Sequence, residues 1–345
     1  MSTKKNSKCL LCVAIALVMV CSLVTVGFAA NKDNVVQYST YTCLGDSIAA
    51  GLYSEQYTGA FKPCPSAYHS YLGETVGAET VNNFAFGAMT SDELRYLVDP
   101  NFEDDYSLEY TSNSQTNGLY IIPSEMDKYK DELRQAIRES DLITIEIGSN
   151  DLFTYAWTTR PQKNSVFLPF EKLLSAAGYN AASVEKLHKI GNLILAADYI
   201  LKTIVNRIDV FEKNWDGIFE GIRNLNYNAK IVAISVINPF EGIKLSPEFD
   251  LPVGKLFNIA TNIVNNYIEY GSHHSHKYTF CDIRDMFTFC EGIYFTQEGD
   301  IQSAIIPLAH PKAEGHKRIA DRIVEVLPAE SDIPGTTKWT EPINN

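Results

Sequence analysis

A serine stands at a point of the sequence where nucleophilic chemistry could be built. Ser47 follows the apolar-rich run Tyr41–Leu44 in the string Gly45-Asp46-Ser47, and small residues come after it, which leaves room for other groups to approach. A serine at such a strand-to-loop junction is a candidate nucleophile. Gly-Asp-Ser strings also occur by chance in turns, so the tripeptide by itself favours a structural turn.

Three later residues follow strand-like runs in a similar way. Gly87 comes after the stretch Glu79–Phe86, where a glycine lets a backbone N–H approach a substrate, although a helix entry also requires a small residue. Asn150 follows the apolar run Asp141–Ile147, and its side-chain amide could face a developing oxyanion. His310 lies on a loop before the last helical segment and is a candidate general base.

In this order the four blocks resemble those of the GDSL or SGNH hydrolase family. The resemblance spans roughly residues 41–327, and the segment Cys64-Pro65-Ser66-Ala67-Tyr68 makes it closest to the secreted lipase and esterase branch. It implies a three-layer α/β/α sandwich with a mainly parallel five-stranded sheet, as in flavodoxin-like folds. It also implies a serine ester hydrolase without a metal or organic cofactor.

The resemblance assigns a role to each residue. Ser47 would be the nucleophile and His310 the base, while the N–H groups of Ser47 and Gly87 would form an oxyanion hole with the Asn150 side chain. The substrate would be a small-molecule, lipid or glycan ester. A lipase or carboxylesterase and a carbohydrate esterase that removes acetyl groups both remain open, and a catalytically inactive surface-binding module is the alternative outside enzymes.

One position departs from the family pattern. The family usually places an aspartate three residues before the histidine, but this chain has Pro307 there. A main-chain carbonyl can accept the same Nδ1–H bond, because orienting the imidazole requires an acceptor more than a full charge. We therefore expect a Ser-His dyad assisted by the Pro307 carbonyl, with Asp300 or Asp285 as the alternative orienting carboxylates.

Alternating strand and helix patterns independently predict a parallel α/β sheet covered on both faces. A long helix is expected over Val184–Phe219 and a last helix over Lys312–Val326. Apolar residues at helical spacing in the long helix are interpreted as core: Ile200, Ile204, Phe211, Trp215 and Phe219. The five expected strands are Ser39–Gly45, Glu79–Ala85, Leu142–Ile147, Lys230–Ile237 and Tyr278–Ile283.

The chain length fits one large α/β domain better than two, and the resemblance implies that this is a hydrolase domain over residues 30–330. Insertions are expected near residues 99–121 and 157–182, and a loose tail over 331–345. The second insertion could form an apolar wall for an acyl chain or simply pack on the sheet.

The first 29 residues have the layout of a secretory signal peptide. Lysines at positions 4, 5 and 8 precede an apolar run over residues 9–28, and cleavage is expected after Ala29, with Ala30 as the alternative. We therefore expect a secreted protein, with an uncleaved N-terminal anchor as the alternative.

Net charge and cysteine content limit the classes of partner that the protein could bind and indicate its cellular compartment. The formal net charge of −13 makes binding to nucleic acid or to an anionic membrane unfavourable. Four cysteines follow the leader, an even number that allows up to two disulfides in an exported chain. Cys281–Cys290 is the first expected pair because of its short spacing, whereas Cys43 in the first strand could be a buried thiol. The fourth cysteine after the leader is Cys64.

Other polar clusters have simpler interpretations. His273-His274-Ser275-His276 is expected to be a solvated turn rather than a metal site, and Glu103-Asp104-Asp105 lacks the pattern of a calcium loop. His316 competes with His310 as the base but is expected in the first turn of the last helix. Glu146, an acid in an otherwise apolar strand, has no explanation from the sequence.

Overall fold

A computed structural model describes most of the expected domain. The described residues are 36–102, 123–157, 207–244, 247, 252–275, 278–287, 289–294 and 307–328. Gln37–Leu327 forms one compact unit. The expected leader, the tail from residue 331, Asp300, the Glu103-Asp104-Asp105 cluster and nearly all of both insertions lie outside the described residues.

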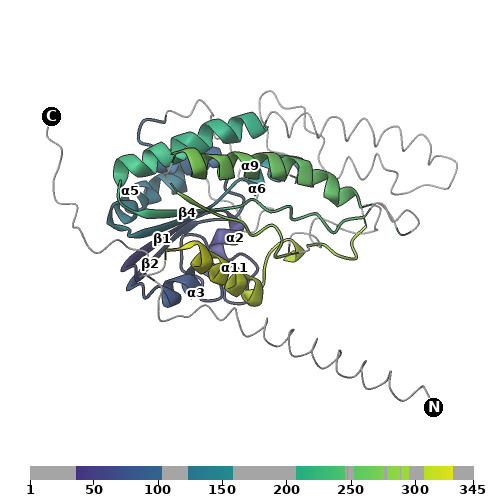
Figure 1. Ribbon diagram of the computed structural model, residues 1–345, viewed down its shortest axis with the longest axis horizontal. Helices are drawn as coiled ribbons and strands as arrows, with labels where there is room; N and C mark the ends of the chain where they lie inside the picture. The colour runs from purple at the N-terminus through teal and green to yellow at the C-terminus, as the bar shows by residue number, and fades with distance from the viewer. Residues whose placement is uncertain are drawn as a thin grey trace, which may run out of the picture. The chain divides into compact units, whose positions relative to one another are not determined.

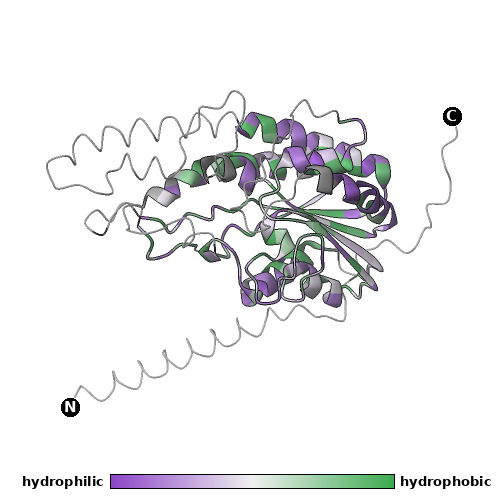
Figure 2. Ribbon diagram, turned by 180° about the vertical axis from the view of Figure 1, so that it is seen from behind, coloured by the Kyte–Doolittle hydropathy of each residue, from purple (hydrophilic) through white to green (hydrophobic). Residues whose placement is uncertain are grey.

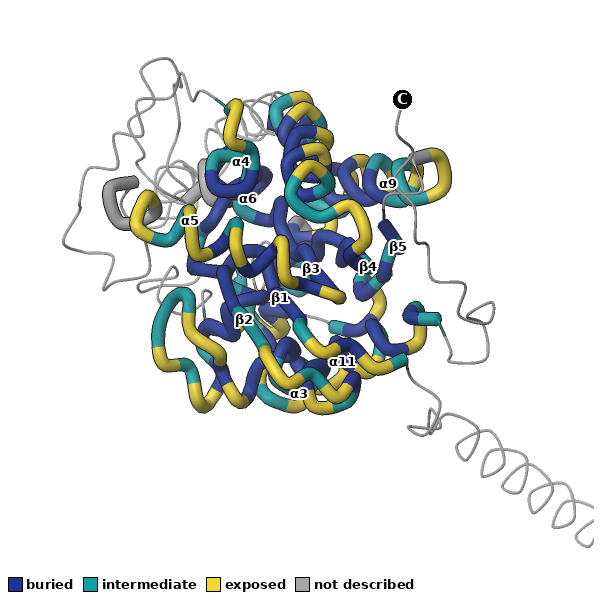
Figure 3. Tube along the Cα trace, turned by 90° about the vertical axis from the view of Figure 1, so that its left-hand side faces the viewer, coloured by how far each residue is buried: buried dark blue, intermediate teal, exposed yellow. Residues whose placement is uncertain are grey.

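A parallel five-stranded sheet forms the centre of this unit, which confirms the expected fold class. Its strands lie side by side in the order β2-β1-β3-β4-β5 (Figure 3), and every neighbouring pair is parallel. Each lies within an expected strand, although β4 and β5 are shorter than expected. The strands are β1 (Thr40–Gly45), β2 (Thr80–Ala85), β3 (Leu142–Glu146), β4 (Lys230–Ile234) and β5 (Thr279–Cys281).

The inner strands are apolar because helices cover both faces of the sheet. All five residues of β3 are buried, as are four of the five residues of β4. Strands buried on both faces read as continuous apolar runs rather than alternating ones. Figure 2 shows apolar residues concentrated along the sheet, and hydrophilic residues on the outer helices. Glu146 is the exception, a charged residue type that is only 1% exposed.

Two layers of helices enclose the sheet (Figures 1 and 3). On one face, α3 (Tyr68–Thr75) packs against α11 (Ala313–Val326). The other face carries helix 207–225 together with α4 (Ser91–Val98), α5 (Pro123–Glu139), α6 (Ser149–Trp157) and α9 (Asn258–Ser275). The short elements are α2 (Ser47–Ala50) and the 3-10 helix η2 (Val253–Phe257). Within the described residues, no helix combines the length and apolarity that crossing a membrane would require.

Helix 207–225 matches the described part of the expected long helix. Phe211, Trp215 and Phe219 are buried, and the first two rings stack with centroids 5.3 Å apart. This confirms their interpretation as core. Ile200 and Ile204 lie outside the described residues, and the helix continues to residue 225, beyond its expected end at Phe219. The last helix, α11, begins one residue later than expected.

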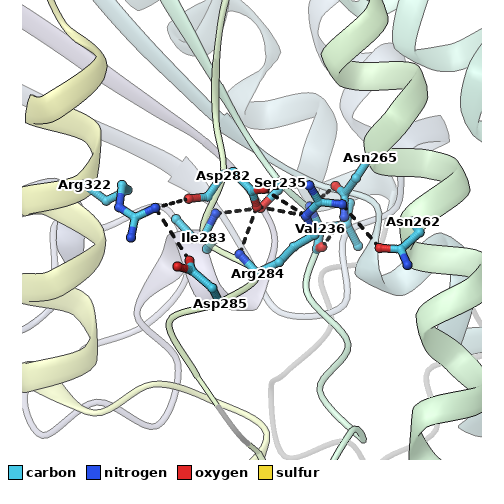
Figure 4. A network of polar contacts seen from close by, with 9 residues as sticks. All are labelled: Ser235, Val236, Asn262, Asn265, Asp282, Ile283, Arg284, Asp285 and Arg322. Carbon is cyan, nitrogen blue, oxygen red and sulfur yellow. Dashed lines mark hydrogen bonds and ion pairs between the residues drawn. The ribbon is translucent and has the colours of Figure 1, made fainter.

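Polar contacts join α11 and α9 to the carboxyl ends of β4 and β5 (Figure 4). Arg322 on α11 donates to the Asp282 carbonyl at 3.0 Å and pairs with Asp285 at 3.5 Å. The Asn265 side chain on α9 accepts from the Val236 N–H and donates to the Val236 carbonyl, both at 2.7 Å. The Arg322 contacts fix α11, the helix that follows His310, relative to the sheet.

The structure corrects two expectations. Cys281 and Cys290 form no disulfide: both are buried free thiols, and the Cys290 thiol donates to the Pro239 carbonyl at 3.2 Å. Cys43 and Cys64 are also free and buried. His273 and His274 are exposed, as expected, but they lie in the last turn of α9 rather than in a free turn, and His274 Nδ1 lies 2.8 Å from the Tyr270 carbonyl.

Candidate active site

Three of the expected site residues follow neighbouring strands. Ser47 comes after β1, Gly87 after β2 and Asn150 after β3, and β1 lies between the other two strands. In the sheet register, Gly45 pairs with both Ala85 and Glu146, so the three strands end at the same level. The carboxyl ends of parallel strands are where open α/β sheets bind ligands.

The turn that carries Ser47 depends on its two neighbours. Gly45 has a φ of +148°, and a Cβ there would lie 2.0 Å from the Glu146 carbonyl oxygen, so only glycine fits. The Asp46 carboxylate caps α2 by accepting from the Ile48 N–H at 3.1 Å. Ser47 is therefore the first residue of a short helix, and its side chain is half-buried.

His310 reaches Ser47 from the opposite end of the chain. Its Nε2 lies 2.8 Å from Ser47 Oγ. The loop is held in place because Lys312 Nζ donates to the Tyr53 carbonyl at 2.9 Å and the Ala313 N–H donates to Glu55 at 3.1 Å. The Tyr53 ring also packs against the imidazole, with centroids 5.2 Å apart. A neutral imidazole at this distance can accept the serine proton.

The two other candidate oxyanion donors lie beside this pair. Asn150 is half-buried, and its Nδ2 donates to Asp46 at 3.0 Å, which fixes the plane of the amide. Gly87 is buried in the turn after β2, next to Ala88, which has a φ of +62°. A non-glycine residue in this left-handed region is uncommon, and such conformations cluster at functional sites.

A buried ion-pair network links α4, the helix that follows Gly87, to α6, the helix that contains Asn150. Asp151 on α6 accepts from the Ser91 N–H at 2.9 Å and from the Ser91 hydroxyl at 2.5 Å. Arg207 bridges Asp151 at 3.2 Å and Asp92 at 2.9 Å. Burial raises the pKa of Asp151 to about 6, while Arg207 acts in the opposite direction. The network thus fixes α4 and α6 relative to each other.

Asp46 and Glu146 form a second buried acidic pair, directly below the Ser47 turn. Burial raises the pKa of Asp46 to about 6, although the hydrogen bonds that it accepts lower it. Burial and the neighbouring Asp46 raise the pKa of Glu146 well above its usual range. Asp46 lies inside the Gly-Asp-Ser string but had no expected role, and Glu146 had no explanation from the sequence.

The candidate groups that would orient His310, and the competing base His316, lie in different environments. Asp285 is largely exposed and pairs with Arg322 (Figure 4), and Pro307 is half-buried three residues before His310. The role of the Pro307 carbonyl as acceptor stays a prediction. His316 lies in the first turn of α11 as expected and is buried against Tyr68, with ring centroids 6.2 Å apart. Within the described ranges, no group of His, Cys, Asp and Glu could hold a metal ion.

Comparisons with known proteins agree with this geometry. Residues 43–318 match the GDSL-like lipase/acylhydrolase family. A comparison with curated proteins finds no match.

Among solved structures, the chain is similar to the extracellular lipase from Streptomyces rimosus, with 14% identity and a TM-score of 0.51, over 84% of this chain and 99% of that one. Phospholipase A1 from Streptomyces albidoflavus NA297 has 13% identity and a TM-score of 0.47, over 84% and 98% of the two chains. The acetyl xylan esterase from Butyrivibrio proteoclasticus has 15% identity and a TM-score of 0.36, over 84% and 63%. The first of these shows a shared fold. Since the family match extends over most of the sequence, this protein belongs to the GDSL-like lipase/acylhydrolase family, a family of ester hydrolases.

Proposed function

We propose that the protein cleaves carboxylic esters through a dyad of Ser47 and His310. The observation that supports this is the 2.8 Å distance between Ser47 Oγ and His310 Nε2 across the ends of the sheet. Ser47 Oγ attacks the ester carbonyl carbon while His310 takes the hydroxyl proton. The resulting tetrahedral intermediate collapses as the imidazolium returns this proton to the leaving alcohol, which leaves an acyl-enzyme.

Water completes the cycle by the reverse sequence. His310 removes a proton from a water molecule, whose oxygen attacks the acyl carbon, and the carboxylic acid leaves as Ser47 regains its proton. In both halves the negative oxygen would be stabilised by the N–H groups of Ser47 and Gly87 and by the Asn150 amide. The position of these residues at adjacent strand ends supports this assignment.

The His310 ring also requires an acceptor for its Nδ1–H. We propose that the Pro307 carbonyl has this role, because the position where the family usually has an aspartate is occupied by proline. A carbonyl supplies direction without a full negative charge, so it would hold the tautomer but stabilise the imidazolium less than a carboxylate would.

The test is ester hydrolysis by Ser47→Ala. We expect kcat/KM for a chromogenic short-chain ester to fall by at least about a thousandfold, because the covalent route is lost. Ser272→Ala on α9 is the matched control, since its hydroxyl donates to the Glu269 carbonyl of the same helix. Near-wild-type turnover in folded Ser47→Ala would reject the dyad. Esters of increasing acyl length, assayed beside an acetylated glycan, would separate a lipase from a carbohydrate esterase.

We also propose that the protein is secreted after cleavage at Ala29. The lysines and apolar run before that residue support this proposal. The N-terminal sequence of protein recovered from culture medium should then begin at Ala30. Recovery of the uncleaved chain in the membrane fraction would instead indicate an N-terminal anchor.

A further inference from the structure

Two carboxyl groups are buried together below the nucleophile turn. Asp46 is 0% exposed and Glu146 is 1% exposed. Their backbones are directly linked, because the Asp46 N–H donates to the Glu146 carbonyl at 3.0 Å. Two adjacent carboxylates in such a place would repel each other strongly, since little water is present to screen them. Their protonation therefore has to be explained together.

Asp46 has the environment of an ionised carboxylate. One of its oxygens accepts from the Ile48 N–H at 3.1 Å, and the other accepts from Asn150 Nδ2 at 3.0 Å. Hydrogen bonds of this kind favour the charged form of an acid. Through them, Asp46 contacts both the helix that begins at Ser47 and the amide proposed to stabilise the oxyanion.

Glu146 has the opposite environment. In its ionised form, neither oxygen has a hydrogen-bond donor in good geometry among the described residues. The groups that act on its ionisation are the Asp46 carboxyl and, more weakly, the Ala49 N–H, and neither carries a positive charge. A buried carboxylate without a cation is strongly unfavourable, whereas a buried carboxylic acid that donates to a neighbouring carboxylate is not.

We propose that Glu146 is a positioning residue that stays protonated at neutral pH and donates a hydrogen bond to the Asp46 carboxylate. This bond holds Asp46 against the Ile48 N–H and the Asn150 amide, and so aligns Ser47 with the oxyanion donor. The inference rests on the proposed ester hydrolysis, because Glu146 acts only through residues of that site.

Loss of the Glu146 proton at alkaline pH would disturb this arrangement. Asp46 and Glu146 would then both be negatively charged and would repel each other below Ser47. Asp46 would move away from the Ile48 N–H and the Asn150 amide, so kcat should fall. The charged or titratable groups that face this pair are Asp151 on α6, Cys43 on β1 and Tyr68 on α3. Burial raises the pKa of Cys43 to about 11 and that of Tyr68 well above its usual range, so both are neutral at neutral pH.

The decisive comparison is between Glu146→Gln and Glu146→Ala. Glutamine keeps the shape and the donor but cannot ionise, so we expect kcat within about threefold of wild type at neutral pH and no alkaline fall due to this group. Alanine removes the donor, and we expect kcat to fall about tenfold to a hundredfold with KM nearly unchanged. Asp321→Asn, at an exposed carboxyl on α11 that pairs with Lys317, is the matched control.

Either of two outcomes would overturn the proposal. If Glu146→Gln loses as much activity as Glu146→Ala, the residue acts as a carboxylate and not as an acid. If Glu146→Ala keeps wild-type kcat and pH dependence, the residue positions nothing.

A measurement without substrate separates this proposal from the proposed function. The infrared difference spectrum between wild type and Glu146→Gln at neutral pH should contain the C=O band of a protonated carboxyl group. A carboxylate band in its place would refute a protonated Glu146 even if Glu146→Ala failed to fold. If the band is present but wild type cleaves no ester, the esterase assignment fails and the protonation state stands.

Discussion

At the scale of single residues, the Asn150 amide is assigned two hydrogen-bond acceptors. Its amide donates to Asp46 in the resting structure, and it is proposed to donate to the oxyanion during the reaction. We expect Asn150→Ala to lower kcat on the order of a hundredfold with little change in KM, because an oxyanion donor acts mainly in the transition state. Steady-state kinetics on one ester would check this. A rise in KM alone would make Asn150 a substrate-binding residue.

The group that orients His310 can be tested by removing carboxylates. Asp285 is already paired with Arg322, so Asp285→Asn should keep most of the wild-type kcat, and we expect the same of Asp300→Asn. His310→Ala should lose nearly all activity, because no base then remains. A loss of several thousandfold in either Asn variant, with an unchanged circular dichroism spectrum, would identify a carboxylate acceptor instead of the Pro307 carbonyl.

Some site residues could be identified from the sequence because the residues next to them in the chain indicate their place in the fold. Ser47, Gly87 and Asn150 each follow a recognisable apolar run, so their place at the sheet edge was predictable. The contact between Asp46 and Glu146 was not, because it arises from the register of β1 on β3, which pairs residues about a hundred positions apart. Short-range patterns do not contain that register.

At the scale of elements, the site depends on the ion-pair network between α4 and α6. Asp151→Ala removes the acceptor of both Ser91 bonds and a carboxylate that pairs with buried Arg207. We expect the free energy of unfolding to fall by roughly 3 kcal/mol, since removing one partner of a buried ion pair leaves the charge of Arg207 less well compensated. Urea unfolding would measure this loss.

The same variant should also affect catalysis. Asp151 is the residue after Asn150, and Ser91 follows the loop that carries Gly87, so two of the three proposed oxyanion donors would be displaced. We expect kcat to fall in parallel with stability. The exposed pair Lys317–Asp321 on α11 offers a control, because Asp321→Ala should change neither quantity appreciably. Full activity in Asp151→Ala would show that the network only stabilises the fold.

The elements themselves were more predictable than their ends. The strands and α11 lie where the spacing of apolar residues predicts them, because that spacing reflects whether one face or both faces of an element are buried. The Cys281–Cys290 pair was wrongly expected because spacing along the chain does not fix the direction of the side chains. Cys281 is buried at the end of β5, and the Cys290 thiol donates to the Pro239 carbonyl. Disulfides require such geometry in space.

For the whole molecule, buried titratable groups set the dependence of stability on pH. Burial lowers the pKa of His69 to about 4 and that of His316 to about 3, so the stability that they contribute is lost as pH falls below about 6.5. Burial raises the pKa values of Asp46 and Asp151 to about 6, so stability from these acids is lost as pH rises from about 4 to 6. The two effects oppose each other in mildly acidic solution.

Between about pH 6.5 and 8, Glu146 should dominate this balance. An unfolded glutamate is ionised there, whereas the folded protein keeps the proton, because burial and Asp46 raise the Glu146 pKa. The free energy of unfolding should therefore fall with pH by about 1.4 kcal/mol per unit until Glu146 ionises. Urea unfolding across this range should show a flatter slope for Glu146→Gln. Equal slopes in both proteins would contradict a raised Glu146 pKa.

The distance along the chain between the two residues of the dyad has a consequence for synthesis. Ser47 and His310 are 263 positions apart, so the serine leaves the ribosome long before its base exists. A nascent chain that has already formed β1 and β2 still lacks the loop before α11, and this loop is positioned by contacts to Tyr53 and Glu55. Hydrolysis can therefore begin only after the last helix has docked. Fragments divided between β5 and α11 should each be inactive and should regain activity together, which would make the enzyme a reporter of its own complete assembly.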